Sequence, residues 1–158
     1  MQTIGWREWV SIPDLGIAGI KAKIDTGARS SCLHTHDFEV YENEAGEERV
    51  RFHLHPLVRT NSIEVSCDWP VNNIREVKDS GGHVELRPFI LVAVQLGENE
   101  WDVELSLSNR EGMKFRMLLG RTALKERFIV DPTKSYRLST SLAHKYGAEI
   151  AAIPSSTN

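Results

Sequence analysis

Residues 20–31 read Ile20-Lys21-Ala22-Lys23-Ile24-Asp25-Thr26-Gly27-Ala28-Arg29-Ser30-Ser31, and this stretch decides the fold. Its apolar residues alternate with two lysines, which is the pattern of a strand with one face in the core. The strand runs directly into Asp25-Thr26-Gly27, residue types that favour a turn. Asp25 is therefore expected where a strand ends. An ordinary side-chain-capped turn is the simplest alternative for these residues.

The rest of the chain repeats this alternation in short segments separated by glycine, asparagine and proline, so we expect a mostly β protein. A glycine turn at Ser80-Gly81-Gly82 separates two polar arms, residues 75–79 and 83–87, and predicts a hairpin that stands out from the core. The nearly continuous apolar run 89–96 predicts a strand covered on both sides. Residues 121–127 predict one or two helical turns, and the segment after Leu138 a second short helix.

Composition indicates one domain over residues 1–153, with a frayed tail at 154–158. The chain has 158 residues, 41% of them hydrophobic, and a formal charge of -3. That charge argues against direct nucleic-acid binding. Neither a signal peptide nor an apolar run of bilayer length is visible, so we expect a cytoplasmic protein that does not bind a membrane. The two cysteines, Cys32 and Cys67, are expected to be reduced.

Three features occur in a characteristic order: Asp25-Thr26-Gly27-Ala28, the glycine-tipped hairpin, and Met117-Leu118-Leu119-Gly120-Arg121. This order resembles the retropepsins, half-length aspartic peptidases, over about residues 16–131. The resemblance implies a closed six-stranded acid-protease barrel with a flap hairpin and one or two short helices. It also implies that Asp25, Thr26 and Gly27 are catalytic.

The chemistry of peptide hydrolysis accounts for these residue types. Without a metal or a covalent nucleophile, one carboxylate must take a proton from water while another donates one to the scissile carbonyl. A single Asp25 cannot do both, so the active unit is expected to be a two-fold homodimer with one Asp25 from each subunit. A second Asp-Ser-Gly string at residues 79–81 follows a charged segment, and 158 residues are about half of what two lobes need. Asp79 is therefore assigned to the flap tip.

A longer match, residues 21–31 with Leu33 and residues 117–124, resembles a bacterial family often labelled ATP-dependent zinc protease. That family accompanies ATP-grasp ligases that add glutamates to a ribosomal protein. The resemblance implies that this chain trims glutamate-rich tails and that such a ligase is a partner.

The family label raises the question of zinc. Cys32, His34 and His36 would share one face of a strand, as would His53 and His55. Neither a His-Glu-x-x-His helix nor a Cys-x-x-Cys pair is present. We therefore expect no cofactor, and keep a zinc-dependent hydrolase as an alternative.

The substrate-binding residues expected from the resemblance surround the turn and the flap. Arg29 stands where retropepsins commonly carry an acid, and a guanidinium in a cleft suits bidentate binding of a carboxylate. The expected set is Ala28, Arg29, Lys78, Ser80, Gly81, Gly82 and Arg87, with Arg49 and Arg51 as further candidates for a basic cleft. A non-catalytic dimeric module that binds acidic peptides is the third alternative.

Overall fold

The structure, a computed structural model, describes residues 1–79, 81–110 and 112–147. Strands dominate it, as the alternating sequence predicts. The elements are β1 (Gln2–Gly5), β2 (Arg7–Ile12), η1 (Pro13–Leu15), β3 (Ile17–Asp25), β4 (Ser31–His34), β5 (Asp37–Glu42), β6 (Glu48–Leu54), β7 (Val65–Pro70), β8 (Asn73–Lys78), β9 (Val84–Leu96), β10 (Asn99–Ser108), β11 (Met117–Gly120), α1 (Arg121–Leu124), β12 (Phe128–Asp131) and η2 (Ala143–Tyr146).

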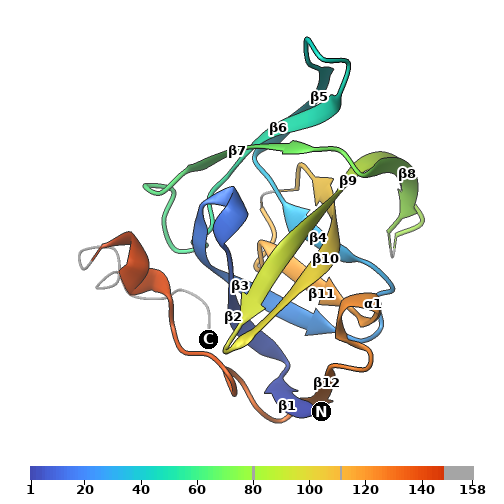
Figure 1. The fold of residues 1–158 in the computed structure, drawn as a ribbon. Helices are drawn as coiled ribbons and strands as arrows, with labels where there is room; N and C mark the ends of the chain where they lie inside the picture. The colour runs from blue at the N-terminus through green and yellow to red at the C-terminus, as the bar shows by residue number, and fades with distance from the viewer. Residues whose placement is uncertain (80, 111, 148–158) are drawn as a thin grey trace.

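Six strands close into a barrel in the order β10-β4-β11-β3-β2-β9, and pairing of β9 with β10 completes the ring (Figure 1). The short strand β11 lies between β3, to which it is parallel, and β4, to which it is antiparallel. This arrangement sets Gly120 beside Asp25 in the register of β11 and β3. The closed six-stranded barrel predicted from the sequence is thus confirmed.

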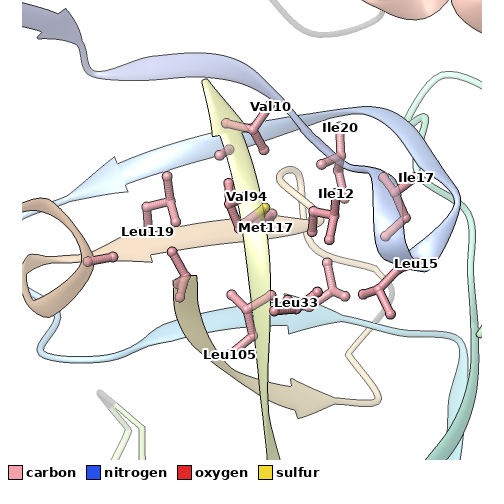
Figure 2. Close-up of a cluster of buried hydrophobic side chains, with 14 of the residues drawn as sticks. Val10, Ile12, Leu15, Ile17, Ile20, Leu33, Val94, Leu105, Met117 and Leu119 are labelled. Atoms are coloured by element: carbon pink, nitrogen blue, oxygen red, sulfur yellow. The ribbon is translucent and has the colours of Figure 1, made fainter. Parts of the chain in front are cut away.

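Alternate residues of each strand fill the barrel with aliphatic side chains (Figure 2). Ile20, Ala22 and Ile24 of β3 point inward and are almost completely buried, whereas Lys23 between them is exposed. The same alternation holds in β11, where Met117 and Leu119 are buried and Leu118 is only partly so. The parity of a residue therefore tells whether its side chain lies in the core or on the outer surface of the barrel.

The prediction that residues 89–96 are covered on both sides is wrong. Leu91 is 47% exposed, and Ala93 and Gln95 are only partly buried. The inner face of β9 packs in the barrel, but Leu91 is on the outer face, where its carbonyl oxygen accepts a hydrogen bond from the indole N–H of Trp69 at 3.0 Å. Apolar residues therefore occur on both faces of this part of β9, yet only one face lies in the core.

Three smaller units surround the barrel (Figure 1). Strands β5, β6 and β7 form a separate antiparallel sheet, and β1 pairs with β12 in a parallel two-stranded sheet. β8 and the start of β9 form the predicted hairpin, with Lys78 opposite Val84. The second predicted short helix is present as the 3₁₀ turn η2, while residues 154–158 lie outside the described residues. No helix in the described ranges is both long and apolar enough to cross a bilayer.

Candidate active site

Asp25 ends β3 in a turn that fixes its carboxylate. The backbone N–H groups of Gly27 and Ala28 both donate to Asp25 Oδ1, at 3.0 and 3.2 Å. Within the described part of the chain, Oδ2 accepts no hydrogen bond. One carboxylate oxygen is thus oriented by the backbone, and the other is available to a water molecule or a second carboxyl group.

The segment that contains Leu-Leu-Gly-Arg is hydrogen-bonded to this turn. Backbone N–H groups of Arg121 and Thr122 donate to the carbonyl oxygens of Ala28 and Arg29, at 2.8 and 3.2 Å. The Thr122 hydroxyl donates to the Arg29 carbonyl at 2.8 Å, and the Arg121 guanidinium to the Gly27 carbonyl at 3.2 Å. The two motifs that carry the family resemblance therefore form one hydrogen-bonded unit.

A row of outward-facing residues crosses five barrel strands next to Asp25. We call this row the cleft floor. The strand registers align Arg7 with Lys23, Lys23 with Leu118, Leu118 with Cys32, and Cys32 with Ser106. Lys23 has the same parity as Asp25, so its side chain extends from the same side of β3 as the candidate catalytic carboxylate.

The flap hairpin covers the Cys32 end of this floor. Arg87 is only 6% exposed, and its Nη1 donates to Cys32 Sγ at 3.6 Å. Glu85 accepts a hydrogen bond from Arg87 Nε. Because Arg87 lies on the flap and Cys32 on β4, this contact sets the inner face of the hairpin against the cleft floor.

A buried polar cluster continues along β4 under the flap. His34 Nδ1 lies 2.7 Å from Ser108 Oγ and 3.8 Å from Cys32 Sγ. Burial lowers the pKa of His34 from 6.5 to about 4, and three nearby arginines, Arg87, Arg110 and Arg116, lower it further against a smaller opposing effect of Glu85. Burial also raises the pKa of the Cys32 thiol. At neutral pH this cluster is therefore an uncharged imidazole and thiol surrounded by cations.

This pKa shift predicts acid-sensitive stability. As the pH falls below 6.5 the unfolded chain binds a proton at His34 that the folded chain excludes until about pH 4, so folding loses up to about 3 kcal/mol across that interval. Urea unfolding at pH 7 and pH 4.5 should show a smaller loss for His34→Gln than for wild type. His144→Gln, at an exposed site, controls for removal of a histidine, and equal losses in all three proteins would refute the assignment.

The flap tip is built around Asp79, as assigned from the sequence. Its Oδ1 accepts the backbone N–H groups of Gly81 and His83, both at 2.9 Å, and its Oδ2 accepts a hydrogen bond from Arg110. The Arg110 hydrogen bond contributes most to lowering the pKa of Asp79 to about 2. Asp79 is thus an ionised turn residue tied to the loop after β10.

The other predicted binding residues do not form one cluster. Arg29 is exposed beside the turn and forms no ion pair within the described residues, while Thr26 and Ala28 lie in the turn itself. Lys78 is exposed and has the opposite parity to Arg87 on the hairpin, so it lies on the outer face.

The glycines of the flap tip lie near Asp79. Gly82 has φ of 84° and donates its N–H to the Asp79 carbonyl at 3.1 Å, and Gly81 precedes it in the same turn. Ser80, the remaining predicted flap residue, lies outside the described residues.

Arg49 and Arg51 are not part of the cleft, contrary to the suggestion from the sequence. Both lie on β6 in the separate three-stranded sheet. Arg49 pairs with Asp68 at 2.7 Å, and Arg51 stacks over Tyr41 at 3.8 Å with acidic groups nearby. Their charges are compensated locally, because strand alternation points them toward the exposed face of that sheet.

Sequence reasoning missed most of the cations near the site, which are Arg7 and Lys23 at the cleft floor, Lys21 farther along β3, and Arg110 and Arg116 near His34. The parity of Lys21 and Lys23 with Asp25 was the available signal. Arg7 reaches the floor through the register of β2 and β3, and Arg116 comes near His34 from the loop before β11, and a sequence displays neither placement.

The histidines predicted to share one face are separated. Cys32 and His34 lie at the flap, whereas the His36 ring lies 5.5 Å from that of His55, and His53 contacts Asp37 at 2.7 Å. No group of three or more histidine, cysteine or acidic side chains suited to a metal ion occurs in residues 1–79, 81–110 and 112–147. The described structure thus divides the predicted histidine and cysteine set between the flap and the outer sheet.

Comparison with known proteins agrees with this geometry. Residues 3–140 match the family described as "Retropepsin-like aspartic endopeptidase RimB". Curated relatives from Shewanella pealeana and Desulfotalea psychrophila, both named "Probable alpha-L-glutamate ligase", are 43% and 45% identical over 135 and 129 residues. The matches cover 85% and 82% of this chain but 29% and 28% of those proteins, so the chain spans less than a third of their length.

A solved structure also matches. The crystal structure of a protein of unknown function from Legionella pneumophila superposes with a TM-score of 0.72 at 26% identity. The match covers 87% of this chain and 98% of that one.

Proposed function

Because the chain belongs to the RimB-like family of retropepsin-like aspartic endopeptidases, we propose that it is an aspartic peptidase that acts as a homodimer on glutamate-rich tails. The observation that carries the proposal is the Asp25 turn, in which two backbone amides hold Oδ1 and leave Oδ2 available. Asp79, the other acid in an Asp-Ser-Gly string, is occupied by Arg110 and the flap backbone. We therefore propose that the second carboxyl group comes from another copy of Asp25.

In such a pair, the ionised carboxylate removes a proton from a water molecule. The oxygen of that water attacks the scissile carbonyl carbon. The protonated partner donates its proton to the carbonyl oxygen. Collapse of the resulting diol breaks the C–N bond as the first aspartic acid protonates the leaving nitrogen and the partner carboxylate takes a proton from a diol hydroxyl, which gives an amine and a carboxylic acid. The pair ends the cycle with one shared proton, as it began.

Two exposed surfaces support pairing of two chains. Thr26 and Gly27 are exposed beside Asp25, so a second turn can approach them. β1 and β12 pair only with each other among the described strands, which leaves an outer edge on each. Ile129 of β12 is 52% exposed. Unpaired strand edges and exposed apolar side chains are common in subunit interfaces.

The charge of the cleft floor supports an acidic substrate. The chain as a whole carries a net charge of -3, yet Arg7 and Lys23 align at the floor. Relatives that contain a region similar to this chain are named for glutamate ligation. A hydrolase of glutamate tails would break the amide bonds that such a ligase forms. We therefore propose the ligase as a functional partner and the tail of a cytoplasmic ribosomal protein as the substrate.

The test uses two synthetic peptides that differ only in carrying a glutamate or a glutamine tail, analysed by mass spectrometry with and without a chelator. We expect cleavage of the glutamate tail alone, at the same rate in both conditions. Loss of cleavage with the chelator and its return with zinc would favour the zinc hydrolase. Binding without cleavage would favour the non-catalytic acidic-peptide module.

Arg29 should contribute to this specificity. Arg29→Ala is expected to lower kcat/KM for the glutamate tail by about three- to tenfold, because an exposed guanidinium beside the site loses a charge-assisted bond to substrate. The glutamine tail should lose nothing, and Arg29→Lys should recover only part of the rate because an ammonium lacks the planar fork. Kinetics at low and high salt measure this, and equal discrimination by all three proteins would contradict it.

A further inference from the structure

Beyond the Asp25 turn, cations lie beside two tryptophans, Trp6 just before β2 and Trp9 on β2. Lys21 is aligned with Trp9, and its Nζ lies 5.7 Å from the indole ring. The Arg7 guanidinium lies 4.6 Å from the Trp6 ring and 5.0 Å from that of Tyr136. The aromatic rings hold these side chains in place, so the cations form a fixed surface.

A small pocket opens in this surface, which we call the Arg59 pocket. It is lined by Trp9, Lys21, Pro56, Leu57, Val58 and Arg59. Arg59 Nε and Nη2 are buried there and have no hydrogen-bond partner among the described residues. Buried guanidinium donors without an acceptor are costly, so a site that retains them is suited to an external anion.

Three cations lie close to Lys21 at the pocket. The pKa of Lys21 is lowered first by burial and then by Arg7, Arg59 and Lys114. The ion pairs found in the described residues include no acid bound to Arg7, Arg59 or Lys114. Among the described residues, Arg7, Arg59 and Lys114 therefore bring positive charge to the pocket without an ion-paired carboxylate.

Strand geometry places this pocket at a fixed spacing from the catalytic turn. Lys21 and Asp25 are four residues apart on β3 and share its outer side, which corresponds to about 13 Å along a strand. An extended glutamate chain has nearly the same rise per residue. Consider a substrate chain that runs beside β3 with its scissile bond at Asp25. The carboxylate of about the fourth residue from that bond would then lie at the pocket.

We propose that the Arg59 pocket is a distal carboxylate subsite that makes the peptidase selective for long glutamate tails. The inference rests on the proposed function and adds a length requirement to it. A tail that ends before the pocket binds at the cleft floor alone. A longer tail also supplies the acceptor that Arg59 lacks.

The experiment compares tails of two and eight glutamates with wild type, Arg59→Gln and Arg51→Gln. Arg51→Gln is a matched control because it removes the same charge from the separate β5-β6-β7 sheet. We expect Arg59→Gln to lower kcat/KM for the long tail roughly tenfold or more and to leave the short tail unchanged. Arg51→Gln should behave as wild type. Equal effects of Arg59→Gln on both tails would overturn the proposal.

A binding assay separates failure of this inference from failure of the proposed function. Fluorescence anisotropy of labelled octaglutamate is measured with Asp25→Asn protein, with and without Arg59→Gln. Weaker binding with Arg59→Gln supports the subsite even if no peptide is cleaved. Unchanged binding, or Arg59-dependent binding of single-stranded RNA in preference to octaglutamate, overturns it. Thermal unfolding gives a further readout, since Arg59→Gln should be as stable as wild type or more so if its donors are unsatisfied.

Discussion

Asp25→Asn is expected to abolish cleavage of glutamate tails, with a loss of at least about 10²–10⁴-fold, because the amide can neither accept a proton from water nor share one. The fold should remain, since the Asn oxygen can still accept the hydrogen bonds that Gly27 and Ala28 donate to Oδ1. The loss would therefore be chemical and not structural.

Rates on the glutamate-tailed peptide and thermal unfolding of the same preparations measure these two effects. Asp79→Asn is the matched control, because it alters the other Asp-Ser-Gly string and leaves the catalytic turn intact. Wild-type turnover by Asp25→Asn would contradict the assignment, as would a loss as large in Asp79→Asn.

Gly120→Ala should have the next largest effect. A Cβ at Gly120 would lie 2.5 Å from the carbonyl oxygen of Ser30 and 2.9 Å from that of Ala28. Both contacts are with backbone, so the catalytic loop must move or the strand must shift. Overpacking of this kind costs about 1–3 kcal/mol, and displacement of the loop should also remove most of the activity.

Gly112→Ala provides the control, because a Cβ there meets nothing within 4 Å. Thermal unfolding and peptide cleavage should separate the two variants, with Gly112→Ala close to wild type in both. A Gly120→Ala protein with normal stability and rate would mean that the loop does not need this close approach.

The barrel was predictable because several of its strands show a local alternation of apolar and polar residues. Ile20, Ala22 and Ile24 of β3 alternate with lysines, and Trp101, Val103 and Leu105 of β10 alternate with two acids. The Asp25 turn and the Leu-Leu-Gly-Arg segment that hydrogen-bonds to it were predictable because each is a short contiguous motif.

The basic surface was not predictable because its members come from distant segments. Arg7, Lys21 and Arg59 come close only through the register of β2 and β3 and the path of the loop before β7. The sequence shows the parity of Lys23 with Asp25 but not which strand lies beside it.

The prediction that Cys32, His34 and His36 share one strand face was wrong for a different reason. Placing Cys32, His34 and His36 on one face assumed a strand through residue 36, but β4 ends at His34. The Thr35 N–H donates to the Ser108 carbonyl of the barrel, and the His36 N–H donates to the His53 carbonyl of the outer sheet, both at 2.7 Å. The chain crosses between two sheets at that point, so the strand parity is lost.

The central claim is that one active site is made from two chains, each of which contributes Asp25. It is tested most directly by mixing wild type and Asp25→Asn in equal amounts, allowing subunits to exchange, and measuring the rate on the glutamate-tailed peptide. If each site needs both carboxylates, only the wild-type pairs are active, and the rate should be roughly a quarter of that of the same total amount of wild type. A rate of roughly one half would show that each chain acts alone and would contradict the claim.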